Sequence, residues 1–374
     1  MKPLKKDYLE INEKDNNVVK RLLILYEERV FFIGDNCLKL DKLALCKALY
    51  PNAYVHINFK PKFLSNYIAL IKNNPNFDKI SADEWDDIDF ESYDMIICAS
   101  YDEPDFQVHL ADRYSHTTKL PLILSTTKYL LDPIPDIKLI YPTHDELFDF
   151  ANTTHKNKPQ EIHVSLEEKT WADNWLLENG LNKDNDLAIL IDSSTSKNKL
   201  LRIEVYFDFL EHLLTNNLKM KILIFDEKNI GKEDFYSAFL GKPELFERII
   251  FSKGLKLRED ISLIASSYTK LVFGPCTGLL HCASGIFNAQ KSSGIPNQQL
   301  PKIIVYTGKY FTKNNNTAKD WWSNSPLVEC LILKKKDNLK VVNLLRNCNT
   351  DELNSKEDLL LCEDYELDLL VSQI

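Results

Sequence analysis

Glycine, net positive charge and long apolar runs are scarce in this 374-residue sequence. Only 10 residues are glycine, against about 26 at average usage, so each glycine in a turn is informative. The formal net charge is −9, which argues against a nucleic-acid-binding protein because such proteins present a basic face. No apolar run approaches the ~18 residues of a membrane span, and the basic residues Lys2, Lys5 and Lys6 precede no apolar segment of a signal peptide.

The eight cysteines form no C-x-x-C pair, and their spacing suits neither a zinc site nor a disulfide framework. Most fall within apolar stretches. We therefore expect small buried hydrophobic residues in a reducing cytosol, and a cytoplasmic protein with at most peripheral contact with the inner membrane.

Short apolar runs alternate with amphipathic stretches along both halves of the chain. In the first half we expect strands at 21–26, 53–57, 94–99 and 120–124, and helices at 38–49 and 62–71. In the second half we expect strands at 187–191, 220–225, 248–251, 270–273 and 302–306, and helices at 204–214, 258–266 and 277–287. This alternation predicts an α/β fold of two Rossmann-like, doubly wound parallel-sheet domains facing across a cleft.

The expected domain boundaries follow from changes in composition. Residues 1–150 form the first domain, and 151–186 form a linker that contains a helix at 167–179. Residues 187–350 form the second domain, in which the polar segment 288–301 is expected to be a loop. The acidic segment 351–374 is expected to be helical and could pack back on the first domain.

The strongest local signal is the strand, turn and helix around Cys276, Thr277, Gly278, Leu279 and His281. Free N–H groups at a helix start favour an anion, a glycine lets a phosphate approach the backbone, and a threonine hydroxyl can contribute. His281 lies one turn into the helix and can face the same place. The alternative is an ordinary strand–turn–helix in which Thr277 caps the helix.

Two further polar turns follow predicted strands. Ser194, Thr195 and Lys199 come after the strand 187–191 and can grip a diphosphate, or they form an ordinary solvated loop. Gly34 and Asp35 come after the first strand, where a carboxylate can accept a proton from a hydroxyl. The alternative for Asp35 is a helix N-cap.

Taken together in order and spacing, motifs between about Lys20 and Val342 resemble the heptosyltransferase family. These are inverting glycosyltransferases of GT-B fold that act in lipopolysaccharide core synthesis. The motifs are Leu22 to Leu25, Gly34-Asp35, Tyr50-Pro51-Asn52-Ala53, the helix Trp175 to Leu181, Lys199, Thr277-Gly278-Leu279-Leu280-His281, Val305-Tyr306-Thr307-Gly308 and Trp321. Three positions depart from the family pattern. Cys276 replaces the signature aspartate, Leu200-Leu201 replaces Trp-Pro, and Phe225-Asp226-Glu227-Lys228 replaces a Gly-Gly-x-Glu-like turn.

The resemblance implies a transfer of heptose or a related sugar from a nucleotide-sugar donor to a saccharide or lipid-linked saccharide, with inversion. Asp35 would be the base, on the acceptor side with Gly34. The donor would meet Ser194, Thr195, Lys199 and residues 276–281, and Glu227 is a candidate for its ribose. No metal ion and no cofactor is expected, because helix-end dipoles can stabilise the diphosphate and the nucleotide sugar is itself a substrate.

Other hypotheses remain open at this point. A UDP-sugar 2-epimerase shares the two-domain shape and also cleaves a sugar–diphosphate bond. A non-catalytic nucleotide-sugar-binding protein of the same fold is motivated by Cys276 in place of the family's aspartate. A purely structural partner protein would not require turns at matching strand ends.

Overall fold

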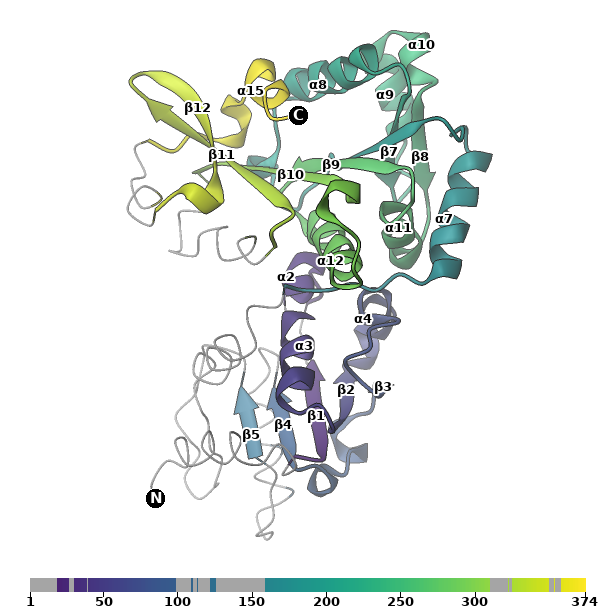
Figure 1. Ribbon diagram of the computed structural model, residues 1–374, viewed down its shortest axis with the longest axis vertical. Coiled ribbons are helices and arrows are strands. Elements are labelled where there is room, and N and C mark those ends of the chain that lie inside the picture. The colour runs from purple at the N-terminus through teal and green to yellow at the C-terminus, as the bar shows by residue number, and fades with distance from the viewer. Residues whose placement is uncertain are drawn as a thin grey trace. The chain divides into compact units, whose positions relative to one another are not determined.

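The computed structural model divides the chain into two compact units (Figure 1). It describes residues 19–26, 30–38, 40–98, 109, 113, 122–125, 159–309, 322, 325–349, 353 and 358–374. The first unit comprises residues 1–32 and 39–160, and the second comprises 33–38 and 161–374. The short segment 33–38 is thus grouped with the second unit. The sequence pattern did not predict this grouping.

The sheet of the first unit has five parallel strands in the order β3-β2-β1-β4-β5. The strands are β1 (Arg21–Tyr26), β2 (Tyr54–Phe59), β3 (Lys79–Ser81), β4 (Met95–Cys98) and β5 (Leu122–Ser125). Helices α3 (Leu40–Leu49) and α4 (Leu64–Ile71) fall within the sequence between these strands. The apolar run of β1 is buried from Leu22 to Tyr26, as expected of a central parallel strand.

The sheet of the second unit has seven strands in the order β12-β11-β10-β9-β6-β7-β8, and all but β12 are parallel to their neighbours. The strands are β6 (Asp186–Leu190), β7 (Met220–Asp226), β8 (Ile249–Lys253), β9 (Thr269–Pro275), β10 (Lys302–Thr307), β11 (Val328–Lys336) and β12 (Leu339–Leu344). Both sheets place their first strand between the second and the fourth, which is the Rossmann order. The predicted α/β fold is therefore confirmed.

Helices cover both faces of the second sheet, since successive residues of its central strands are buried whichever way they point. The helices are α7 (Leu166–Glu178), α8 (Ile203–Asn216), α9 (Lys232–Leu240), α10 (Pro243–Phe246), α11 (Leu257–Ile264), α12 (Gly278–Ser292) and α15 (Leu367–Val371). Phe209 and Leu210 of α8 share a core with Phe273 of β9 and Tyr306 of β10. Helix α12 also packs against β9 and β10.

Three local expectations were wrong. Residues 34–36 form no turn but lie inside helix α2 (Ile33–Leu38). The expected loop 288–301 is partly helical, because α12 continues to Ser292, where buried Asn288 bonds to Ser284 and Ser325. In the described part of 351–374 the helical residues are Leu353, the 3-10 turn Cys362–Asp364 and α15, so this part is not one continuous helix.

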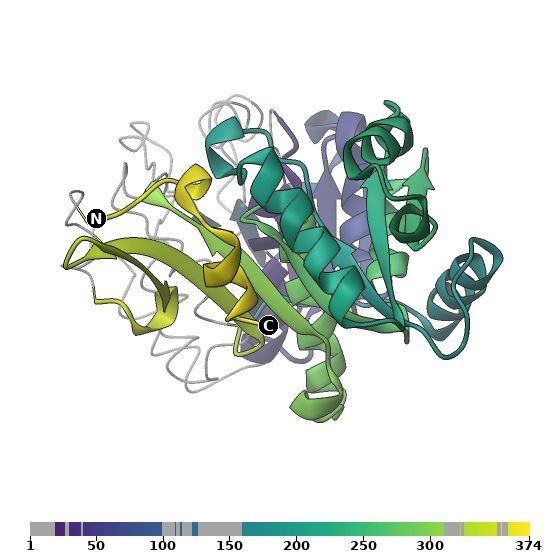
Figure 2. The same ribbon diagram turned by 90° about the horizontal axis from the view of Figure 1, so that it is seen from above.

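The chain's last segment packs on the second unit. Tyr365 and Leu370 are fully buried in the same core as α8, and Figures 1 and 2 both show α15 beside α8. The described residues of this segment are grouped with the second unit, whereas the sequence analysis considered packing on the first domain. The physical reason is that apolar side chains of this segment, among them Leu367 and Leu370, pack in the core that contains α8 and strands of the second sheet.

Seven cysteines lie among the described side chains, and all seven are buried and free of disulfides, as expected. Across the described ranges, no helix combines the length and apolar character that a membrane crossing requires. The lysines at 2, 5 and 6 lie outside the described residues.

A buried histidine joins three segments of the first unit. His56 Nε2 lies 2.8 Å from Ser81 Oγ, which itself donates to Asn58 Oδ1, so His56 is the donor to Ser81. Its Nδ1 then accepts a hydrogen bond of 2.6 Å from the Tyr93 hydroxyl. Burial, reinforced by Lys79, lowers the pKa of His56 to about 4. The neutral ring is therefore the form that holds β2, β3 and the segment before β4 together.

We predict that this histidine makes the first unit acid-sensitive. Below the ordinary pKa of 6.5 the unfolded chain binds a proton that folded His56 refuses until about pH 4. The free energy of unfolding should therefore fall as pH drops from 6.5 to 4. Urea titrations between pH 6.5 and 4 measure the free energy of unfolding of the unmodified chain and of His56→Gln, which should lose less of it. A variant that shows the same loss between pH 6.5 and 4 as the unmodified chain contradicts the assignment.

Candidate functional site

The candidate site lies at the carboxyl edge of the second sheet. There β6 lies between β7 and β9, so the chain connections on its two sides run in opposite directions. Leu190 of β6 is opposite Phe273 of β9, and the loops after both strands therefore leave the same edge. In open α/β sheets ligands bind at this switch point.

The loop after β9 leads directly into the 15-residue helix α12. Thr277 is its N-cap, and in the described structure its side chain accepts no hydrogen bond from the helix. The N–H groups of Leu280 and His281 bond to Thr277 O at 3.1 and 3.3 Å. Thr277, Gly278 and Leu279 are all partly exposed. This first turn therefore presents backbone N–H groups and the positive end of the helix dipole toward the switch point.

Lys199 brings a positive charge to the same turn. It ends the 3-10 turn Lys197–Lys199 in the loop after β6, and its Nζ donates to Cys276 O at 3.1 Å. The Cys276 side chain is buried, and burial raises the pKa of its thiol to about 12. The thiol is therefore neutral, and Cys276 meets Lys199 through its carbonyl oxygen.

Helix α2 packs closely on the start of α12 (Figure 1). A Cβ added to Gly278 would lie 2.6 Å from Ile33 Cβ, and one added to Gly34 would lie 3.2 Å from His281 Cδ2. The space beside Gly278, which the sequence suggested for a phosphate, is thus taken by Ile33. The two glycines let the helices approach.

This packing brings Asp35 to the second unit. Asp35 lies in the first turn of α2 and is exposed, so it is neither an N-cap nor buried. Desolvation by neighbouring atoms raises the pKa of its carboxyl above 3.8, and the charge of Lys199 opposes the rise. The site therefore combines a carboxylate of enhanced basicity with a nearby ammonium group.

His281, in the first turn of α12, is buried and uncharged. Its ring stacks on Trp322 with centroids 4.0 Å apart and planes inclined by 8°. Burial, aided by the charge of Lys199, lowers its pKa to about 3, so the ring is neutral near pH 7. The sequence pointed to Trp321, which lies outside the described residues; the aromatic partner seen here is Trp322.

The remaining predicted residues are less engaged. Ser194 is partly exposed and accepts a hydrogen bond from Ser196 N at 3.3 Å. Thr195 and Glu227 are exposed, and Glu227 follows directly after β7. Among the described residues, no three His, Cys, Asp or Glu side chains gather as a metal ion would require.

Sequence reasoning gave no role to Asp192, the first polar residue after β6. It forms an ion pair of 2.6 Å with Lys232, a residue 40 positions further along the chain. Its position after a predicted strand was the only signal in the sequence.

No protein-family model matches the chain, and comparison with curated proteins finds no match. Solved structures do match. The glycosyl transferase family 9 structure from Veillonella parvula superposes with a TM-score of 0.58 at 14% identity, covering 83% of this chain and 85% of that one. The ADP-heptose LPS heptosyltransferase II of E. coli superposes with a TM-score of 0.56 at 13% identity, covering 95% of this chain and 99% of that one.

The chain therefore has the fold of the GT-B glycosyltransferases, with two Rossmann-like units, and the resemblance predicted from its motifs is confirmed for the fold. Both structures share only 13–14% of their residues with this chain, so the likeness is one of fold.

We predict that Gly278→Ala destabilises the second unit by about 1–3 kcal/mol, because the new methyl group collides with Ile33. Gly34→Ala should cost less, since its nearest contact, to His281 Cδ2, is longer at 3.2 Å and the helical propensity of alanine offsets about 1 kcal/mol. Urea unfolding of both variants tests the order. Equal or reversed costs would show that α2 does not pack as described.

Proposed function

We propose that this chain is an inverting glycosyltransferase that moves a heptose or a related sugar from a nucleotide-sugar donor to a saccharide or lipid-linked saccharide. One observation carries the proposal. At the switch point of the second sheet, helix α2 with Asp35 packs on the start of α12, and Lys199 donates to the neighbouring Cys276 O, on a fold seen in glycosyltransferases.

The second unit binds the donor in this proposal. The diphosphate would lie at the N–H groups of residues 277–279, with Lys199 as the neighbouring cation and Ser194 and Thr195 as further donors of hydrogen bonds. Glu227, exposed after β7, would accept from the ribose hydroxyls. The heptosyltransferase II of similar fold carries ADP-heptose in its name, so an adenosine nucleotide is the first donor to test.

Asp35 is the proposed base. Its carboxylate takes the proton of the acceptor hydroxyl, and the freed oxygen attacks the anomeric carbon. The bond from that carbon to the diphosphate breaks on the opposite face, and the diphosphate leaves with the electron pair. Lys199 and the positive end of α12 stabilise the charge that grows on the leaving group, so the mechanism requires no metal ion. The raised pKa of Asp35 strengthens it as a base.

The acceptor is assigned to the first unit, and the reaction to the cytoplasm, where a lipid-linked acceptor would bring the chain to the inner membrane only peripherally. The net charge of −9 favours small-molecule partners over nucleic acid.

A second candidate, a protein that binds a nucleotide sugar without turning it over, is favoured by the neutral thiol of Cys276. The two are separated by an assay for nucleoside diphosphate release in the presence of extracted glycolipids. Binding without release supports the second candidate.

We predict that a nucleotide donor stabilises the folded chain. A ligand at 100 times its Kd adds about 2.7 kcal/mol and raises the melting temperature by several degrees. A thermal-shift screen of ADP-, GDP-, UDP- and CMP-sugars tests it, with Lys199→Met as the variant that should lose most of the shift. If none of the four classes shifts the unmodified chain, the proposed donor site is wrong.

We predict that Asp35→Asn lowers turnover by about 10²–10⁴ because the base is lost, while donor binding in the thermal-shift assay is retained. The exposed Asp184→Asn is the matched control and should react normally. The unmodified enzyme should lose kcat/KM as pH falls through a pKa above 3.8, the ordinary value for Asp35. Normal turnover by Asp35→Asn would place the base elsewhere.

A further inference from the structure

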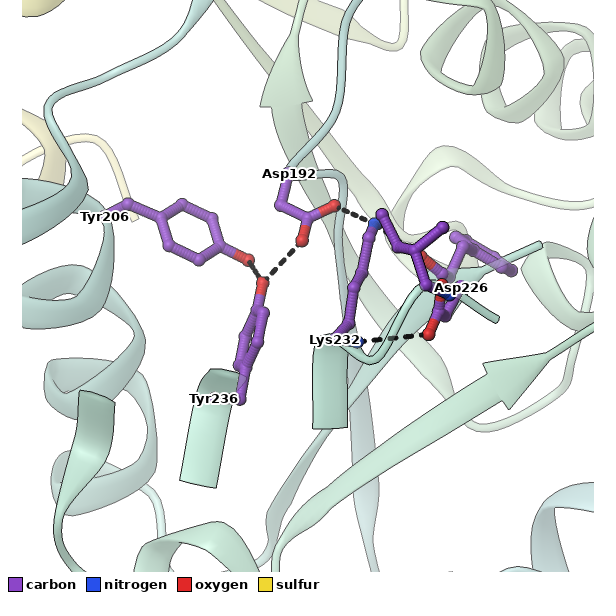
Figure 3. A network of polar contacts seen from close by, with 7 residues as sticks. Asp192, Tyr206, Asp226, Lys232 and Tyr236 are labelled. Carbon is purple, nitrogen blue, oxygen red and sulfur yellow. Dashed lines mark hydrogen bonds and ion pairs between the residues drawn. The ribbon is translucent and has the colours of Figure 1, made fainter. Parts of the chain in front are cut away.

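A cluster of polar side chains lies beside the candidate site and is not used by the proposed reaction (Figure 3). It gathers Asp192 after β6, Asp226 at the end of β7, Tyr206 of α8, and Lys232 and Tyr236 of α9. Asp192 opens the loop that carries Ser194, Thr195 and Lys199 to the switch point. What holds Asp192 therefore also holds the start of that loop.

The Asp192 carboxylate is held through both oxygens. Lys232 Nζ donates to Oδ1 at 2.6 Å, and the Tyr236 hydroxyl donates to Oδ2 at 2.8 Å. Only 13% of the Lys232 side chain and 15% of the Asp192 side chain is exposed. Removing one partner of an ion pair so withdrawn from water leaves the other charge uncompensated, which costs more than the loss of a surface pair.

The two tyrosines fix the direction of the hydrogen bonds. Since the Tyr236 hydroxyl donates to Asp192, its oxygen accepts a hydrogen bond from the Tyr206 hydroxyl, which lies 2.8 Å away. Burial raises the pKa of both hydroxyls well above 10.0, so both keep their protons. The chain of donors thus runs one way, from α8 through α9 to Asp192.

The same lysine is tied to the neighbouring loop. Lys232 Nζ also donates to Phe225 O at 2.6 Å, at the end of β7. The buried Asp226 accepts from Ile230 N at 2.9 Å and from Lys232 N at 3.2 Å, which closes the loop 227–231. That loop carries Glu227. Lys232 therefore joins the loop of Lys199 to the loop of Glu227.

We propose that Asp192 is a positioning residue. Through Lys232 and Tyr236 it holds in place the loop of Lys199 and the loop of Glu227, which bind the diphosphate and the ribose of the donor. This role rests on the proposed function. Asp192 acts through Lys199 and contacts no reacting atom. Its loss lets the loop shift, and a misplacement of about 1 Å costs up to about a hundredfold in activity.

The first experiment needs no ligand. In Asp192→Asn the shape of the side chain is kept, but the negative charge opposite Lys232 and one of the two acceptor oxygens are lost. Amide hydrogen exchange in residues 193–202 and 227–232 should rise about tenfold together. Glu168→Gln is the matched control, since Glu168 and Arg258 form an ion pair of equal length, 2.6 Å, with both side chains 14% exposed. Exchange unchanged in either loop, or raised equally by Glu168→Gln, overturns the lock.

The second experiment is a double-mutant cycle on the Kd for whichever of ADP, GDP and UDP binds the unmodified chain most tightly by calorimetry. Asp192→Asn should weaken binding at least about tenfold in the unmodified chain, but less than twofold in the background of Lys199→Met. Tyr236→Phe, which removes a single hydrogen bond, should show a smaller effect with the same dependence.

The outcomes separate the two proposals. If Asp192→Asn weakens nucleotide binding equally in the unmodified chain and in Lys199→Met, Asp192 acts only on stability. That result overturns the positioning role, while the proposed donor site stands. Binding that is insensitive to Asp192→Asn does the same. If no nucleotide binds the unmodified chain, the proposed function fails, and the role of Asp192 in donor binding fails with it.

Discussion

The close approach of α2 to α12 is the contact on which the candidate site depends. Without a Cβ at Gly278, Ile33 can lie against the first turn of α12, and Gly34 can lie beside His281. The carboxylate of Asp35 is then held in the same unit as Lys199, whose charge acts on it. A side chain larger than hydrogen at Gly278 would push the helices apart and move the proposed base away from the anion-binding turn. The glycines thus serve the site through packing.

Sequence patterns predicted the parallel strands well, because a strand buried on both faces must be a short apolar run. β1 lies at the predicted bounds, and β10 differs by one residue at its end. β11 and β12 were missed. The last three residues of β11 are lysines, and β12 is only half-buried at the edge of the sheet, so neither shows a full apolar run. The end of α12 was missed for a related reason, since Asn288 there is polar yet buried and hydrogen-bonded.

The site was predictable where local rules suffice. A strand followed by Thr277 and Gly278 gives an anion-binding helix start, and Lys199 follows a neighbouring strand. The placement of α2 was not predictable, because it rests on contacts between residues about 245 positions apart, such as the buried thiols of Cys37 and Cys282 at 3.6 Å. Neither was the partner of Asp192, since nothing in the sequence relates it to a lysine 40 positions later.

The neutral thiol of Cys276 affects the charge of the proposed donor site. A carboxylate there would add a negative charge beside the anion-binding turn, whereas a thiol with a pKa of about 12 adds none at neutral pH. Its neighbour His281 is neutral as well, so the charges at this turn come from Lys199, Asp35 and the helix dipole. This arrangement of charges attracts a diphosphate more strongly than the same site would with a second carboxylate. The proton acceptor of the proposed mechanism is Asp35, on a different helix. In the proposed mechanism, a neutral side chain at position 276 therefore affects neither the proposed base nor the proposed anion-binding turn.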